Sequence, residues 1–152
     1  MGQPAILDHF QRVRARTLDF LADLPEEMIE RQPAAGPSVA DSLRHIAEGA
    51  DYWCHHVFLD GRGETKLSRE NCSGREALRA ALEASAGRLL AIFGAAGGTA
   101  MDRDFPVPWD AKKTYKGSER LLYLAAHEAH HRGRAVQAAR ELGWAGKVRF
   151  PY

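Results

Sequence analysis

The chain has 152 residues, which suits one domain with a single hydrophobic core spanning residues 1–152. A hydrophobic content of 45%, a charged content of 27% and a formal net charge of +1 give no bias towards nucleic acid or an acidic membrane surface. Two cysteines exclude a disulfide scaffold and favour a reducing compartment. With neither a secretory signal nor a membrane-length apolar run, we expect a cytoplasmic protein without membrane or nucleic-acid partners.

Apolar residues repeat at three- and four-residue steps in four segments, which predicts four long helices. Ser38, followed by Asp41, is typical of a loose capping box at the start of the second helix, and Ser73 with Glu76 repeats the signal before the third. Gly143 is expected to close the fourth helix, which begins at Ser118. We expect helices over about residues 5–24, 38–60, 73–96 and 118–142.

Four helices of this length, each with one apolar stripe, predict an all-α fold, a four-helix bundle. The connection between the third and fourth helices, residues 99–117, is long and contains Pro106, Pro108 and Trp109. Such a connection, with short extended pieces, can cover a site at the mouth of the bundle. The tail over residues 144–152 is partly apolar and is expected to pack back on the body.

The segment HEAHHRGR, residues 127–134, places three histidines on the fourth helix. Because a helix turns about 100° per residue, His127 and His131 lie one turn apart on the flank of the apolar side, whereas His130 faces solvent. A pair at this spacing brings two imidazoles to one point, as a metal ion requires. The alternative is a pair of partly exposed polar residues without a ligand.

A third ligand has to come from another helix, and His45 is the best placed candidate. It lies on the flank of the second helix, with Ser42 and Gly49 one turn away on either side, and such small neighbours leave room for an ion. Three ligands leave coordination positions open, as in catalytic sites. The other histidines either face elsewhere or lie three turns away: His9, His55, which we expect to be exposed, and His56.

The letters H-E-x-x-H also occur in zinc proteases, where the glutamate is the general base and a third ligand follows downstream. Here Glu141 is the only later carboxylate, and ten residues of helix place it about 15 Å from His131. In the extended protease motif a glycine follows the second histidine by three residues, whereas Gly133 follows His131 by two. Glu128 falls within the apolar stripe instead, where we predict an ion pair with Arg132 or a role in orienting a ligand histidine.

The second-helix segment SVADSLRHIAEGADYW and the fourth-helix segment HEAHHRGR resemble the DinB/YfiT-like superfamily of small metal-binding bundles. The resemblance extends from the first helix to the end of the fourth. Carried over by position, the family's three metal ligands fall on His45, His127 and His131. The resemblance implies a four-helix bundle, often a homodimer, that binds a divalent ion: zinc or nickel first, with iron or manganese as alternatives.

Family members of known activity are thiol transferases, which join a low-molecular-weight thiol such as bacillithiol or mycothiol to an electrophile; a maleylpyruvate isomerase belongs to the wider superfamily. The resemblance therefore implies a metal-dependent thiol S-transferase with a small thiol and an electrophile as partners. Arg134 replaces the glutamine of the commoner HHRGQ, which leaves the thiol open. The alternative is a non-catalytic bundle that binds a metal or a small molecule for sensing or stress.

Other residues near these helices are candidates for lesser roles. Cys54 lies near the apolar stripe of the second helix and is interpreted as a buried structural cysteine instead of a ligand or nucleophile. Residues 110–152 hold nine Lys/Arg against four Asp/Glu, which suits either a solvated helix face or an anionic small ligand. The residues that we expect to line a pocket are Tyr52, Trp109, Tyr115 and Lys116.

Overall fold

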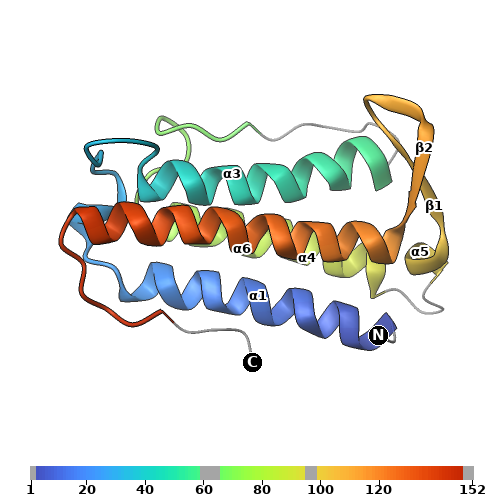
Figure 1. The fold of residues 1–152 in the computed structure, drawn as a ribbon, viewed down its shortest axis with the longest axis horizontal. Helices are drawn as coiled ribbons and strands as arrows, with labels where there is room; N and C mark the ends of the chain where they lie inside the picture. Colours follow the sequence, from blue (N-terminus) through green and yellow to red (C-terminus); the bar gives the residue numbers. More distant parts are fainter. Residues whose placement is uncertain (1–2, 59–65, 95–98, 149–152) are drawn as a thin grey trace.

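The computed structural model describes residues 3–58, 66–94 and 99–148, and this part of the chain is mostly helical, as the all-α prediction required (Figure 1). A one-turn helix follows the first long helix, another follows the third, and α3 runs on into a π-helical segment. The helices are α1 (Gln3–Asp23), α2 (Glu26–Ile29), α3 (Val39–Tyr52), the π-helix η1 (Trp53–Phe58), α4 (Gly74–Phe93), α5 (Thr99–Asp102) and α6 (Gly117–Glu141).

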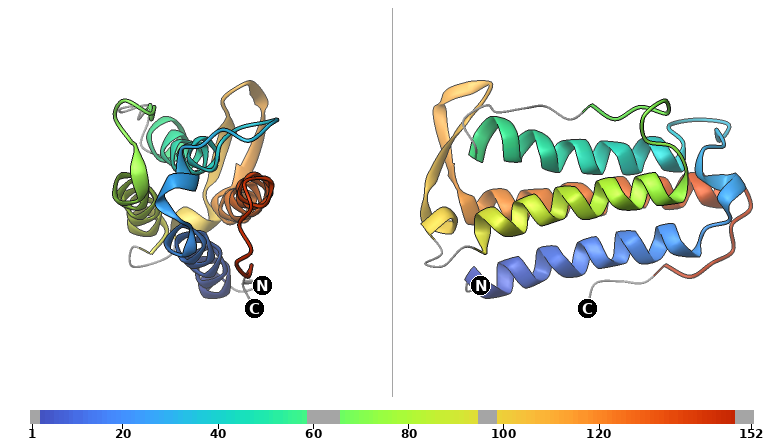
Figure 2. Two further views of the ribbon diagram at one scale, coloured as in Figure 1. Left: turned by 90° about the vertical axis from the view of Figure 1, so that its left-hand side faces the viewer. Right: turned by 180° about the vertical axis from the view of Figure 1, so that it is seen from behind.

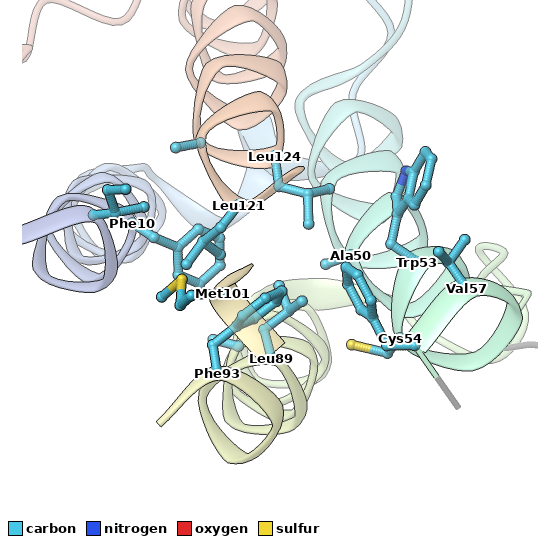
Figure 3. Packing of buried hydrophobic residues seen from close by; sticks show 14 of the residues in the cluster. Phe10, Ala50, Trp53, Cys54, Val57, Leu89, Phe93, Met101, Leu121 and Leu124 are labelled. Atoms are coloured by element: carbon cyan, nitrogen blue, oxygen red, sulfur yellow. The ribbon is translucent and has the colours of Figure 1, made fainter. Parts of the chain in front are cut away.

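The four long helices lie side by side, and each packs against two others (Figures 1 and 2). Helix α6 contacts α1 and α3, and α4 contacts the same two helices. Two apolar clusters fill the interior. In the first, Phe10, Leu89 and Leu121 point toward one another from α1, α4 and α6 (Figure 3). The second lies at the other end of the helices and contains Leu43 and Leu82. Each such buried side chain contributes about 1.5–3 kcal/mol to stability.

The helix ends confirm part of the predicted capping. Ser38 Oγ accepts a hydrogen bond from Asp41 N at 3.0 Å, and Asp41 Oδ2 accepts one from Ser38 N at 3.1 Å, so the capping box of α3 is complete. Gly143, with φ +98°, follows α6 in the left-handed conformation that glycine favours. Ser73 does precede α4, but its hydroxyl donates to Glu30 Oε1 at 3.1 Å instead of capping the helix, so that prediction was wrong.

Helix α6 begins at Gly117, one residue before the predicted start. Glu119 satisfies this end, since its Oε2 accepts a hydrogen bond from Lys116 N at 2.8 Å. A Cβ atom at Gly117 would overlap the carbonyl oxygen of Ala100, so only glycine permits this close approach of α5. The predicted end of the second helix near 60–61 and the stop of the third before 97–98 lie outside the described residues; the described part of α4 ends at Phe93.

The segment between α4 and α6 is more ordered than a plain connection. After α5, strands β1 (Asp104–Val107) and β2 (Asp110–Lys116) form an antiparallel hairpin at one end of the helices, with Phe105 opposite Tyr115 (Figure 1). Phe105 is buried and continues the first apolar cluster, which is why the hairpin is held against the helix ends. The short extended pieces of the prediction are therefore a two-stranded sheet, and the fold is not purely helical.

The described part of the tail packs back on the body, as predicted. Trp144 is buried, and its ring meets that of Phe20 edge-on with centroids 5.3 Å apart. Arg140 lies over the same indole at 4.7 Å. Among the described helices, none combines the length and the apolar character that crossing a membrane would require.

Candidate metal centre

The three predicted ligands meet between α3 and α6. One nitrogen from each of His45, His127 and His131 can be chosen so that all three lie within 4.8 Å of one another. The Nε2 atoms of His45 and His127 are 3.2 Å apart. Nitrogens bound at about 2.0–2.1 Å to one tetrahedral ion lie about 3.3 Å apart. The donor set therefore fits a single divalent ion with small adjustments of the rings.

Local helix geometry accounts for this convergence. His127 and His131 are one turn apart on α6, and their ring centroids are 4.4 Å apart. His45 faces them from α3, with its ring 4.2 Å from that of His131. Gly49 makes the approach possible, because a Cβ atom there would lie 3.1 Å from Cε1 of His127. The small neighbour predicted from the sequence is thus in direct contact with a candidate ligand.

The surroundings of the two α6 histidines hold them neutral. Burial, followed by the neighbouring His127 and His45, lowers the pKa of His131 to about 4. Burial, followed by His45 and His130, also lowers the pKa of His127. A neutral imidazole keeps a lone pair for a metal ion, so protons compete weakly for these two rings at neutral pH. His45 is exposed, and the cluster therefore opens to solvent on its side.

The remaining histidines stay outside the cluster of potential ligands in the described part of the chain. His130 is exposed on α6, as predicted. His9 is half-buried on α1, and His56 is exposed beside the Tyr52 ring at 4.7 Å. His55 is half-buried where exposure was predicted, because the wider turn of η1 changes the direction in which its residues face.

Glu128 is buried as predicted, with 1% of its surface exposed, but its predicted ion pair with Arg132 was wrong. Its carboxylate accepts hydrogen bonds from two residues of α1, Arg14 through Nε at 2.9 Å and Thr17 through Oγ1 at 2.6 Å. Arg132 donates instead to the carbonyl of Val13 at 2.9 Å and to Thr17. Since these contacts turn Glu128 toward α1 and away from α3, it is not placed as a general base for the histidine cluster.

Cys54 has no exposed surface and belongs to the first apolar cluster (Figure 3). Burial raises the pKa of its thiol to about 12. The second cysteine, Cys72, is also buried, and burial raises its pKa as well. Thiolate is the reactive form, so both are structural cysteines, as predicted for Cys54.

A pocket of about 310 Å³ lies one to two helical turns before His127 along α6. Of the predicted lining residues, Trp109 and Tyr115 belong to it, whereas Tyr52 and Lys116 do not. Three lining residues on α6, Glu119, Arg120 and Tyr123, were not predicted. Tyr123 and Arg120 precede His127 by four and seven residues, and this spacing was a usable signal. The complete lining is Val107, Trp109, Lys113, Tyr115, Glu119, Arg120 and Tyr123.

Comparisons with known proteins agree with the resemblance seen in the sequence. The structure of a DinB-like protein of Bacillus subtilis, YjoA, is similar over 97% of each chain with a TM-score of 0.68, at 19% sequence identity, which shows a shared fold. No curated protein matches the chain. The family model described as the DinB family matches residues 1–147, nearly the whole length. The chain therefore belongs to the DinB family.

Proposed function

We propose that this DinB-family protein binds one divalent metal ion through His45, His127 and His131 and acts as a metal-dependent thiol S-transferase. The observation that carries the proposal is the convergence of three imidazole nitrogens within 4.8 Å at a solvent-open point between α3 and α6. Zinc and nickel suit an all-imidazole site best, and iron or manganese are the alternatives. The thiol and the electrophile are small molecules.

A divalent ion at this position would lower the pKa of a thiol that reaches it and so provide a thiolate nucleophile at neutral pH. The chain supplies the conditions for that chemistry. Three neutral ligands leave the charge of an ion undiminished and occupy fewer positions than a closed structural site does. Cys54 and Cys72 are buried with raised pKa values, so the reacting thiol has to come from a second molecule. Exposure of His45 leaves a way in for it.

Metal content tests the ligand set directly. Protein purified without a histidine tag or added metal should contain about one equivalent of a divalent ion by elemental analysis, as expected for a single site. His45→Ala and His131→Ala should each remove it, because two imidazoles hold an ion weakly. His130→Ala is the matched control on the same helix and should retain full metal. Retention of metal by His45→Ala would rule out the ligand set.

The thiol-transfer step is tested by loss of free thiol. Metal-loaded protein is mixed with bacillithiol, mycothiol or glutathione and with chlorodinitrobenzene, and the remaining thiol is measured against metal-free protein and against His131→Ala. We expect thiol loss above the uncatalysed rate only with the loaded wild type, with release of chloride and a proton. One equivalent of bound metal together with no thiol loss for any of these thiols would favour the alternative, a non-catalytic metal-binding module.

A further inference from the structure

Arg120 is a buried arginine, and two of its guanidinium nitrogens lack a hydrogen-bonding partner among the described residues. Only 5% of its surface is exposed, and its Nε and Nη2 atoms are buried with no acceptor in the described part of the chain. Buried polar groups almost always have partners, and a buried charge without one is costly. Arg14, on α1, shows the usual arrangement, since its guanidinium is paired with the Glu128 carboxylate at 2.9 Å. The unpaired donors of Arg120 therefore require an explanation.

Aromatic rings hold the Arg120 guanidinium in place. Its carbon Cζ lies 4.2 Å from the ring centroid of Trp53, 4.1 Å from that of Tyr115 and 5.5 Å from that of Tyr123. Cation–π contacts compensate part of the desolvation of the charge, but they leave the N–H groups without acceptors. Burial also lowers the pKa of Arg120. The group nevertheless stays charged at neutral pH, because an arginine guanidinium keeps its proton there.

The pocket beside Arg120 has the composition of a site for a planar anion. Three of its seven lining residues are aromatic, and Arg120 and Lys113 contribute positive charge. Glu119 is its acidic side chain, and that carboxylate is engaged by Lys116 N at 2.8 Å. Lys113 pairs with Asp110 at 3.1 Å on the exposed side, whereas Arg120 forms no ion pair within the described part of the chain. Trp109 is 70% exposed and forms an apolar wall that a ligand would cover.

The pocket is aligned with the histidine cluster. Tyr123 lies between the two, with its ring stacked on His127 at a centroid distance of 6.1 Å. Arg120 and His127 are seven residues apart on α6, which is two helical turns or about 10 Å along the axis. A small aromatic molecule anchored at Arg120 would extend along Tyr123 toward the cluster.

We propose that this pocket binds an aromatic carboxylic acid, whose carboxylate accepts hydrogen bonds from Arg120 and whose ring lies against Trp109 and Tyr123. The inference deepens the proposed function, on which it rests for its biological meaning: the electrophilic substrate is an aromatic acid. An arginine fork is well matched to the two oxygens of a carboxylate, and the buried setting strengthens such charge-assisted bonds. Because these donors are buried, the proposed binding requires the enclosing rings to shift so that the carboxylate reaches them.

The test uses metal-free protein, so that the pocket is probed independently of the histidine cluster. Benzoate and benzamide, which match in shape and differ in charge, are titrated into the protein and followed by NMR. Benzoate should bind at least about tenfold more tightly than benzamide, and Arg120→Gln should remove that preference. Arg79→Gln, an exposed arginine on α4 paired with Glu83, is the matched control and should bind benzoate as the wild type does. Equal affinity for the two probes would overturn the proposal.

A second variant keeps the test decisive if Arg120→Gln does not fold. Trp109→Ala removes an exposed wall of the pocket and should weaken benzoate and benzamide alike by about tenfold, because aromatic contact serves both probes. Unchanged benzoate binding by this variant would contradict the proposed pocket.

A third probe separates the two possible sources of the carboxylate. N-acetylcysteine is a small thiol that also carries a carboxylate. If it binds the pocket more tightly than benzoate does, the pocket is reassigned to the thiol substrate. If the protein binds benzoate but contains no metal, the proposed pocket is supported and only the proposed function is refuted.

Discussion

His127 and Glu128 are neighbours in the chain and serve opposite purposes, and the same is true of His131 and Arg132. Because each residue turns the helix by about 100°, the two histidines face α3, whereas Glu128 and Arg132 face α1. On the α3 side the groups are half-buried, and burial lowers their pKa values. On the α1 side they are buried and charged, and each has a hydrogen-bonding partner.

One short motif thus provides candidate metal ligands on one face and a structural contact with α1 on the other. We call this contact, made by Glu128 and Arg132, the clamp. The α1 side joins α6 to α1 in the layer between the two apolar clusters, with Arg14 also donating to Ser85 Oγ on α4 at 2.9 Å. On the α3 side, the ring nitrogens of His127 and His131 make no such bonds to other described helices, except for the approach of His45 to His127. Substitutions on the α1 side should therefore change stability, and substitutions on the α3 side should change metal affinity.

The largest effect is expected for Glu128→Gln, which keeps the shape and removes the charge that neutralises Arg14. Leaving a buried arginine unpaired should lower the free energy of unfolding by about 3–5 kcal/mol, measured by urea denaturation. Glu141→Gln, an exposed position on the same helix, should stay within about 0.5 kcal/mol of the wild type. Loss of metal by folded Glu128→Gln protein would contradict the separation of the two sides.

A smaller effect is expected for Thr17→Val, which removes one donor to the Glu128 carboxylate and leaves its pairing with Arg14 intact. Hydrogen bonds to charged groups contribute about 1.5–3 kcal/mol, and the unfolding free energy should fall by that amount. Thr114→Val on the exposed face of the hairpin is the control, with a change within about 0.5 kcal/mol. A Thr17→Val protein as stable as the wild type would show that the clamp does not need this hydroxyl.

The smallest change in stability, with a clear change in metal affinity, is expected for Gly49→Ala. The added Cβ atom would press on the His127 ring from 3.1 Å, and the ring has to move. Supporting contacts of this kind are typically worth tenfold or more in affinity, so we expect metal binding to weaken by about tenfold in competition with a chelator. The unfolding free energy should change by no more than about 1 kcal/mol, since alanine favours the helix.

Gly133→Ala supplies the matched control for that measurement. This glycine also lies within a long helix, two residues after His131, but a Cβ atom there would meet nothing within 4 Å. Metal affinity should stay at the wild-type value, while stability rises by up to about 1 kcal/mol. Equal weakening of the metal by both alanine variants would refute the role of Gly49 in admitting His127.

Much of the candidate site was available from the sequence because helical spacing is local information. The positions of His127 and His131 relative to the apolar stripe of α6, and of His45 relative to that of α3, follow from counting residues around a helix. The capping box at Ser38 and the glycine that ends α6 are equally local signals. Each of these predictions depends on residues within two helical turns of one another.

The partners of Glu128 and Arg120 in distant segments were decided by the tertiary structure alone. Arg14 and Glu128 are 114 positions apart, and no local pattern distinguishes this pairing from the nearer pairing of Glu128 with Arg132. The enclosure of Arg120 likewise needs Trp53 from η1 and Tyr115 from β2, which come together only when the hairpin closes on the helix ends. Helix periodicity sets the direction in which a side chain points, whereas packing of the whole chain selects the group that it meets.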